Sequence, residues 1–441
     1  MQPLPTMEGK PARPTRAEVA LHALMCATAI AGFFCGIAYE WLPPLIDFGA
    51  YYHGAQDVAH DPGNLYEWAR QPESRIDLVR SPYIYPPMLA GVIGPLGLLS
   101  MNVAGNLWRV MDLAAFVIAV WVLGKLAPTG GRRGLLLSAA VLLPAAGIEL
   151  LRGQTNGVLL MCIAGAMLLA QRQRGFAAAV LLVLAGGIKL LPLALLPLLW
   201  MQCGRRAIAG TLLGGLLVMC APLPWLLANH GLDGLAVNFR LHTEYLFDVL
   251  LGHASSADPV RIGGQGIGNY SYGATLVRVY DRLDRGVGLT TLAYWLPPYR
   301  LGLLMGLMLY AVALVTAWRS RRDPDRAWLA WPPALCLLWL GNLTTWLAHL
   351  VILAPLVVVF HVLALERKRP LWAPVAVVVI LLAVYLPFFM LTLVDRDSVL
   401  LRVSRLADWG ISSAVIVWLS LTVCAMLWGP RPDSAATPPP Q

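Results

Sequence analysis

The chain has 441 residues, of which 58% are hydrophobic and 13% are charged. Soluble domains carry roughly 25% charged residues, so this composition excludes a soluble globular enzyme. The charged residues fall in short clusters between apolar runs of about 14 to 25 residues, a length suited to a hydrocarbon layer roughly 30 Å thick. The net charge of +9 comes from basic clusters beside these runs, not from a basic patch interleaved with aromatics, which argues against a nucleic-acid partner. The sequence predicts an all-α polytopic membrane protein.

Thirteen apolar runs are candidate transmembrane helices. In chain order they cover residues 20–42, 86–100, 102–126, 134–150, 155–171, 175–188, 189–201, 207–228, 301–318, 327–343, 347–364, 371–394 and 411–428. The positive-inside rule expects the basic clusters between them to share the cytoplasmic face. Thirteen crossings would place Arg132 and Arg133 outside. If run 86–100, which three prolines interrupt, is re-entrant and does not cross, every cluster becomes cytoplasmic. The sequence therefore predicts about twelve crossings, with both termini inside.

This topology predicts a single membrane domain over residues 19–428. A cytoplasmic tail, residues 1–18, precedes it, and a disordered cytoplasmic tail, residues 429–441, follows. Two extracytoplasmic loops, 43–85 and 229–300, are too long to be simple connectors, so we expect function on that side. We expect the protein to reside in the inner (plasma) membrane.

Asp47 follows the first predicted helix, in the sequence PPLIDFGAYY (residues 43–52). A carboxylate at the membrane edge, partly removed from water, is suited to take a proton from a hydroxyl nucleophile. The alternative is an interfacial carboxylate that the amides at a helix N-terminus satisfy. The position of the residue leaves both interpretations open.

Three further side chains stand out at membrane depth. The short runs 175–188 and 189–201 would form a hairpin with Lys189 at its tip. Helices this short are tolerated in a membrane only where protein encloses them, so we expect Lys189 to face an enclosed cavity. A lone lysine there is costly and suggests an anionic partner such as phosphate, although it could instead snorkel to the interface. Tyr85 begins a tyrosine-proline-proline sequence and could equally belong to an interfacial aromatic belt. His349, on an otherwise apolar helix, could be a core histidine.

A set of short motifs follows in a fixed order. The motifs are DFxxY at 47–51 with GNLY at 63–66, YPP at 85–87, GQxN at 153–156, KxxP at 189–192, GNxS at 268–271 with Arg278 downstream, and WxxH at 346–349. No single motif is specific, but the ordered set is. From about residue 20 to 365 the sequence resembles the polyprenol-phosphate-mannose-dependent mannosyltransferases of glycosyltransferase family 87, which have the GT-C membrane fold.

The resemblance implies a GT-C-type bundle that transfers a hexosyl group, most often mannosyl, from a polyprenyl-phosphate donor to a hydroxyl of a glycolipid or polysaccharide acceptor. Asp47 matches the family's catalytic aspartate, the proposed general base. The residues it places around the donor phosphate and the substrate are Lys189, Arg278, His349, Asn269, Ser271, Tyr85, Gln154 and Asn156. Ala348 and Tyr270 depart from the family pattern, so the sugar and the acceptor stay open.

The resemblance implies a reaction that needs a base on one side of the sugar and positive charge around the leaving phosphate, so we expect no metal or other cofactor. The DxD sequences at 323–325 and 395–397 are interpreted as solvated charge. Direct displacement with one base predicts inversion at the anomeric carbon. The alternative function is a lipid-linked sugar flippase or transporter without glycosyl transfer, which many crossings and intramembrane polar residues would also fit.

Overall fold

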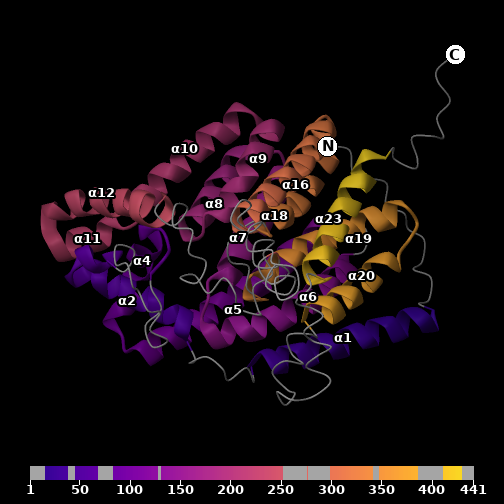
Figure 1. The fold of residues 1–441 in the computed structure, drawn as a ribbon, viewed down its shortest axis with the longest axis horizontal. Helices are drawn as coiled ribbons and strands as arrows, with labels where there is room; N and C mark the ends of the chain where they lie inside the picture. The colour runs from indigo at the N-terminus through magenta and orange to yellow at the C-terminus, as the bar shows by residue number, and fades with distance from the viewer. Residues whose placement is uncertain are drawn as a thin grey trace, which may run out of the picture.

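The computed structural model describes residues 15–37, 45–67, 83–127, 131–251, 276, 298–340, 347–385 and 411–429. Within these ranges the regular elements are helices, and no strand occurs (Figure 1). The α-helices are α1 (Arg16–Ile37), α2 (Ile46–His60), α4 (Pro87–Ile93), α5 (Met101–Leu126), α6 (Gly131–Arg152), α7 (Asn156–Gln171), α8 (Gly175–Ile188), α9 (Leu196–Cys203), α10 (Arg205–Cys220), α11 (Leu223–His230), α12 (Gly234–Glu244), α16 (Pro298–Ser320), α17 (Pro324–Ala327), α18 (Trp331–Trp339), α19 (Leu353–Glu366), α20 (Trp372–Ile380) and α23 (Ile411–Trp428). The shorter helical elements are η1 (Pro62–Asn64), η2 (Gly94–Leu98), η3 (Leu191–Leu195), η4 (Gly231–Asp233), η5 (Tyr245–Leu251), η7 (Trp328–Ala330), η8 (Leu347–Ile352) and η9 (Leu381–Tyr385).

Seven helical segments of the described chain are long and apolar enough to cross a membrane. They cover Glu18–Cys35, Met101–Leu126, Arg133–Arg152, Arg205–Val249, Arg300–Ser320, His349–Glu366 and Ile411–Trp428. Shorter apolar helices accompany them: Pro87–Leu98, Asn156–Gln171, Gly175–Ile188, Leu191–Cys203, Trp328–Trp339 and Trp372–Tyr385. The chain is an all-α polytopic membrane protein, as predicted. The total of about twelve crossings stays a prediction, as do the ends of the membrane domain and the two tails.

The segment predicted to be re-entrant forms α4 and η2. Prolines stand at the start of each element, where a missing backbone N–H removes no helical hydrogen bond. Together the two elements cover Pro87–Leu98, which at helical rise is roughly 20 Å and short of a hydrocarbon layer roughly 30 Å thick. Their length therefore fits a segment that does not cross alone.

The larger core is centred on α6, which packs against α1, α5 and α19, while α7 packs against α5 and α8. Glycines allow two of the close helix approaches. A Cβ atom at Gly147 would lie 2.5 Å from the Phe33 carbonyl oxygen, and one at Gly210 would lie 2.2 Å from that of Phe176. Lipid tails are as apolar as leucine, so close packing of small residues, not apolar burial, holds such helices together.

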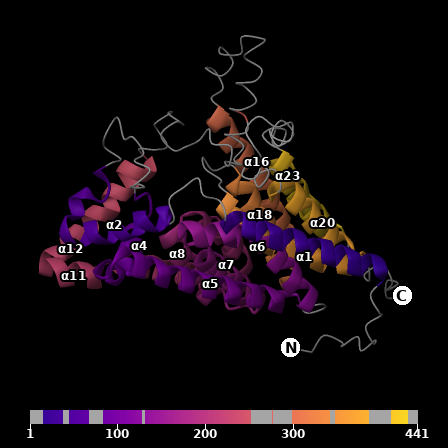
Figure 2. The ribbon, with the colours of Figure 1, turned by 90° about the horizontal axis from the view of Figure 1, so that it is seen from below.

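A second, smaller core lies at one end of the long axis, where α2, α4, α11 and α12 gather (Figures 1 and 2). One buried tyrosine, Tyr66, joins the chain after η1 to the chain before α4, and a second, Tyr83, fixes the turn that leads into α4. The Tyr66 hydroxyl donates to the Tyr85 carbonyl oxygen at 2.7 Å, and the Tyr83 hydroxyl donates to that of Pro86, also at 2.7 Å. Burial raises the pKa of Tyr66 well above its usual value, so this hydroxyl stays a donor.

The two predicted loops contain helices of their own. α2 lies inside 43–85 and buries Phe48, Tyr51 and Val58 at helical spacing. Polar residues interrupt this apolar pattern, so the segment is too polar to be recognised as a membrane run; they are Asp47, His53, Gln56, Asp57 and His60. In 229–300 the chain continues as η4, α12 and η5 to Leu251; apart from residue 276 and 298–300, the rest lies outside the described residues.

Several basic residues lie together at one end of the helices. Arg133, near the start of α6, lies 3.9 Å from Glu18 near the start of α1. Arg326 of α17 pairs with Glu366 at the end of α19 at 2.9 Å. Arg367, directly after α19, donates to a backbone carbonyl in the last turns of α23. The opposite ends of α6, α7 and α8 converge, with the start of α2, on a group of buried polar residues.

Candidate active site

The turn between α6 and α7 brings buried polar side chains together. α6 ends at Arg152, Gly153 adopts a left-handed conformation with a φ of 69°, and α7 begins at Asn156. The Trp108 indole of α5 donates to the Gln154 carbonyl oxygen at 2.8 Å and holds the turn against α5. The sequence GQxN is therefore a tight connection whose side chains start at a defined place in the bundle.

Gly153→Ala is expected to lower the free energy of unfolding by about 1–3 kcal/mol, because a residue with a side chain is strained at this φ. The new Cβ would also lie 2.7 Å from the Phe48 Cβ. The thermal unfolding midpoint of purified protein in detergent measures the effect. Gly215→Ala is the matched control, since nothing lies within 4 Å of its Cβ position. Equal midpoints for the two variants would contradict the expectation.

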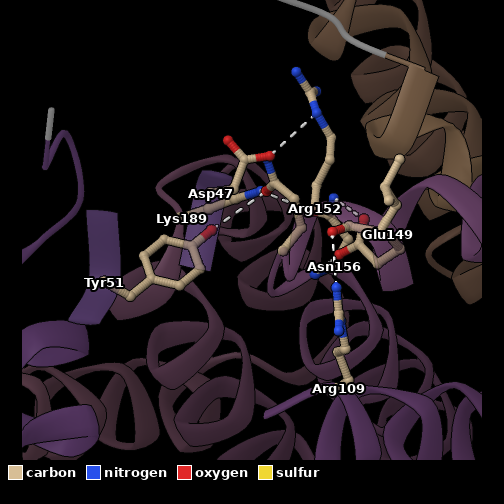
Figure 3. Close-up of polar contacts among 9 residues, drawn as sticks. Asp47, Tyr51, Arg109, Glu149, Arg152, Asn156 and Lys189 are labelled. Carbon is tan, nitrogen blue, oxygen red and sulfur yellow. Dashed lines mark hydrogen bonds and ion pairs between the residues drawn. The ribbon is translucent and has the colours of Figure 1, made fainter. Parts of the chain in front are cut away.

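Lys189 directly follows α8 and turns its side chain into the protein (Figure 3). Its ammonium donates to Gln154 Oε1 at 2.8 Å and to Asn156 Oδ1 at 2.7 Å. The Nζ atom also lies 5.9 Å from the centre of the Tyr85 ring. The lysine is thus bound to two buried amides and does not snorkel to the surface.

The two amides that receive Lys189 are themselves held by other side chains. The Asn156 backbone N–H donates to Glu149 Oε1 at 2.6 Å, and its Nδ2 donates to Glu149 Oε2 at 3.0 Å. The Tyr51 hydroxyl donates to Gln154 Oε1 at 3.4 Å. Glu149 is 1% exposed. A hydrogen-bonded chain therefore runs from α2 through Lys189 to the inside of α6.

Asp47 lies in the first turn of α2 and faces the end of α6 (Figure 3). Its Oδ2 atom is 3.5 Å from Arg152 Nε, and both side chains are 16% exposed. The Leu45 N–H donates to the Leu151 carbonyl oxygen at 2.8 Å and joins the start of α2 to the same turn. In the described part of the chain Oδ2 accepts no hydrogen bond, so helix amides do not satisfy it there.

The structure brings five of the predicted site residues together: Asp47, Tyr85, Gln154, Asn156 and Lys189. His349 lies in η8, which packs against α6 and α7, and it is within electrostatic range of Lys189 and Arg152. Its ring centre is 5.7 Å from that of Trp339. The other three predicted residues, Arg278, Asn269 and Ser271, lie outside the described residues.

Sequence reasoning did not select Glu149, Arg152 or Tyr51 as site residues, nor did it select Asp112, a structural acid beside the site that caps a helix. Asp112 of α5 is 2% exposed, and its Oδ1 accepts the Val158 N–H at 3.2 Å, which caps the start of α7. The available signal was an acidic residue inside an apolar run, since ionisable groups at membrane depth are costly and usually functional. Glu149 and Asp112 both meet that criterion.

Among the described residues, no group of three or more His, Cys, Asp or Glu side chains is placed to hold a metal ion. The independence from metals and cofactors stays a prediction. The chemistry that the site offers is a carboxylate beside a guanidinium, with an ammonium and a buried amide pair close by.

Comparison with known proteins supports the resemblance. The model of glycosyltransferase family 87 matches residues 83–330. A relative from Mycobacterium tuberculosis (strain CDC 1551 / Oshkosh) is named polyprenol-phosphate-mannose-dependent alpha-(1-2)-phosphatidylinositol pentamannoside mannosyltransferase. It is 28% identical over 379 residues, which are 82% of this chain and 75% of the relative. A protein with the same name from Mycolicibacterium smegmatis (strain ATCC 700084 / mc(2)155) is 27% identical over 318 residues, 69% of this chain and 67% of the relative.

The family match contains Tyr85, Gln154, Asn156 and Lys189, and it covers more than half of the chain. Asp47 and His349 lie outside it, so their roles depend on the site geometry and on the motif order. The chain belongs to glycosyltransferase family 87 and is a polytopic membrane glycosyltransferase.

Proposed function

We propose that the protein transfers a mannosyl group from a polyprenyl-phosphate-mannose donor to a hydroxyl of a glycolipid or glycan acceptor. Family membership supports the reaction class, and the names of both relatives state that donor for those proteins. The same names state a phosphatidylinositol pentamannoside acceptor. Mannosylated phosphatidylinositol is therefore the first acceptor class to test.

The observation that carries the proposal is the partly buried ammonium of Lys189, held by Gln154 and Asn156 beside the Asp47–Arg152 pair. A cation held in place by fixed hydrogen bonds stabilises the charge that develops on a leaving phosphate. The Asp47 carboxylate, in the first turn of α2, can take the proton of an attacking hydroxyl. The two groups that the transfer needs thus meet at the turn between α6 and α7, which Asp47 approaches through Arg152 and Lys189 through Gln154 and Asn156.

In the proposed step the acceptor oxygen attacks the anomeric carbon of the donor. The bond from that carbon to the phosphate oxygen breaks, the hydroxyl proton passes to Asp47, and polyprenyl phosphate leaves. A single displacement inverts the anomeric carbon, so a β-linked donor gives an α-mannoside. Lys189 and His349, together with Arg278, Asn269 and Ser271, are the residues we assign to the donor phosphate and the substrate.

We propose that this chemistry takes place on the extracytoplasmic side of the inner membrane. The support is the distribution of charge, since Arg133, Arg326 and Arg367 lie at the helix ends opposite the site. Basic residues concentrate on the cytoplasmic side of membrane proteins. Both termini would then be cytoplasmic.

Purified protein in lipid nanodiscs, given a synthetic polyprenyl-phosphate mannose and phosphatidylinositol mannosides, tests the proposal. The expected result is mannosylated lipid together with an equal amount of free polyprenyl phosphate. A flippase or transporter would move the donor between leaflets and release no polyprenyl phosphate. Release of none under these conditions, with donors of several sugars, would contradict the proposed transfer.

A further inference from the structure

We propose that Glu149 is a positioning residue that holds the Lys189 ammonium in place for the donor phosphate, acting through the side-chain amide of Asn156. The proposal rests on the proposed function and deepens it by adding a residue to the same site. Within the described residues Glu149 makes no hydrogen bond to Lys189, and Asn156 links the two side chains.

The first step is the orientation of the Asn156 amide. Both Oε atoms of Glu149 face donors of Asn156, one its backbone N–H and the other its Nδ2, so the carboxyl group is the acceptor at this contact. An ammonium only donates, and Lys189 faces Oδ1 at 2.7 Å. The reversed amide would set oxygen against carboxylate and NH2 against ammonium. Only one orientation of the amide satisfies both neighbours, and Glu149 favours it by accepting from Nδ2 on the side away from Lys189.

The second step is the position of the ammonium. Lys189 has three N–H donors, and within the described residues two of them go to Gln154 and Asn156. The third is left for an anionic ligand. A lysine side chain is long and flexible, so its ammonium stays at one point only while both amide oxygens hold it. Turning the Asn156 amide would remove one of these two contacts.

The third step separates position from charge. Asp112 is a second buried carboxylate within electrostatic range of Lys189. Asp112 caps α7 by accepting the Val158 N–H, whereas the Asn156 side chain donates to Glu149. Replacing either acid by its amide should change the potential at Lys189 in the same direction. Only the change at Glu149 should also free the Asn156 amide.

The test measures the dissociation constant of a polyprenyl phosphate for the full-length protein in nanodiscs, with the thermal unfolding midpoint as a check of folding. Glu149→Gln keeps one acceptor and places an NH2 against an Asn156 donor, so binding is expected to weaken about tenfold. Glu149→Asp keeps two acceptor oxygens and is expected to recover part of that loss. Asp112→Asn is the matched charge control and is expected to change binding by less than about twofold.

A double-mutant cycle with Lys189→Met supplies the readout that a merely structural role would not move. Once the ammonium is absent, Glu149→Gln is expected to add no further loss of phosphate binding. Asn156→Ser tests the same link if Glu149→Gln does not fold, and it is also expected to be non-additive with Lys189→Met. The donor KM should rise with the dissociation constant across the series.

Unchanged binding in Glu149→Gln, equal losses in Glu149→Gln and Asp112→Asn, or full additivity with Lys189→Met would each overturn the positioning role. In those cases mannosyl transfer by the unmodified protein would still stand. If the unmodified protein binds no polyprenyl phosphate and transfers no mannose, the proposed function falls, and this inference falls with it.

Discussion

Replacing Asp47 by asparagine is expected to lower kcat for mannosyl transfer by about 10²- to 10⁴-fold, the usual contribution of a general base. Asparagine keeps the shape of the side chain but cannot take the proton from the acceptor hydroxyl. The measurement is the initial rate at saturating donor and acceptor in nanodiscs. Binding of polyprenyl phosphate should change far less than kcat, because the base acts on the acceptor.

The matched control for this variant is Asp61→Asn. Asp61 caps the other end of α2, is exposed and accepts a hydrogen bond from Asn64 Nδ2 at 3.0 Å, which asparagine can also accept. Its rate should stay within about twofold of the unmodified protein, as for most surface changes. Arg152→Gln separates catalysis from the ion pair. Transfer at the normal rate by Asp47→Asn, or a loss no larger than that of Arg152→Gln, would exclude the base role.

Replacing Lys189 by methionine is expected to lower kcat/KM for the donor by about 10²- to 10³-fold, a typical cost of removing one preorganised charge-stabilising group. Methionine has a similar length but carries no charge to stabilise the leaving phosphate. The loss should appear both in the donor KM and in kcat, because the phosphate is bound in the ground state and gains charge in the transition state. Lys189→Arg, which keeps the charge with a different geometry, should lose less.

Lys125→Met provides the comparison for a lysine elsewhere in the bundle. Lys125 lies in the last turn of α5, where its Nζ is 5.3 Å from the centre of the Trp121 ring. This variant should transfer mannose at close to the normal rate. Folding must be checked in Lys189→Met, because the side-chain oxygens of Gln154 and Asn156 lose their ammonium donor. Each buried polar group left unpaired costs about 1–3 kcal/mol of stability. A folded Lys189→Met protein with normal donor kinetics would rule out the assigned role.

The class of the protein and its family could be predicted from the sequence because both are local properties. The scarcity of charge and the length of the apolar runs identify a membrane protein without any knowledge of how its helices pack. The ordered motifs place Asp47, Tyr85, Gln154, Asn156 and Lys189 at the ends of helices. GQxN could be recognised because a turn with one glycine is itself a local structure.

Helix α2 could not be predicted from the hydropathy of the sequence. Its apolar residues repeat at helical spacing, but the segment is too polar to be recognised as a membrane run and too buried to be a loop. Its burial depends on α4 and α5, and the partner of its first turn, Arg152, lies about a hundred residues further along the chain. A hydropathy profile averages over neighbouring residues and carries no information about a partner so distant in the sequence.

The sequence by itself determined that this chain is a helical membrane glycosyltransferase of a known family, and it predicted Lys189 and Asp47 as site residues. Only the tertiary structure decided which groups hold them: Arg152 beside Asp47, and Glu149 behind Asn156. Glu149 and Asp112 are visible in the sequence as acids in apolar runs, yet nothing local distinguishes the acid that orients an amide from the acid that caps a helix. Hydrogen bonds act over about 3 Å and depend on direction, so these assignments exist only once the helices have packed.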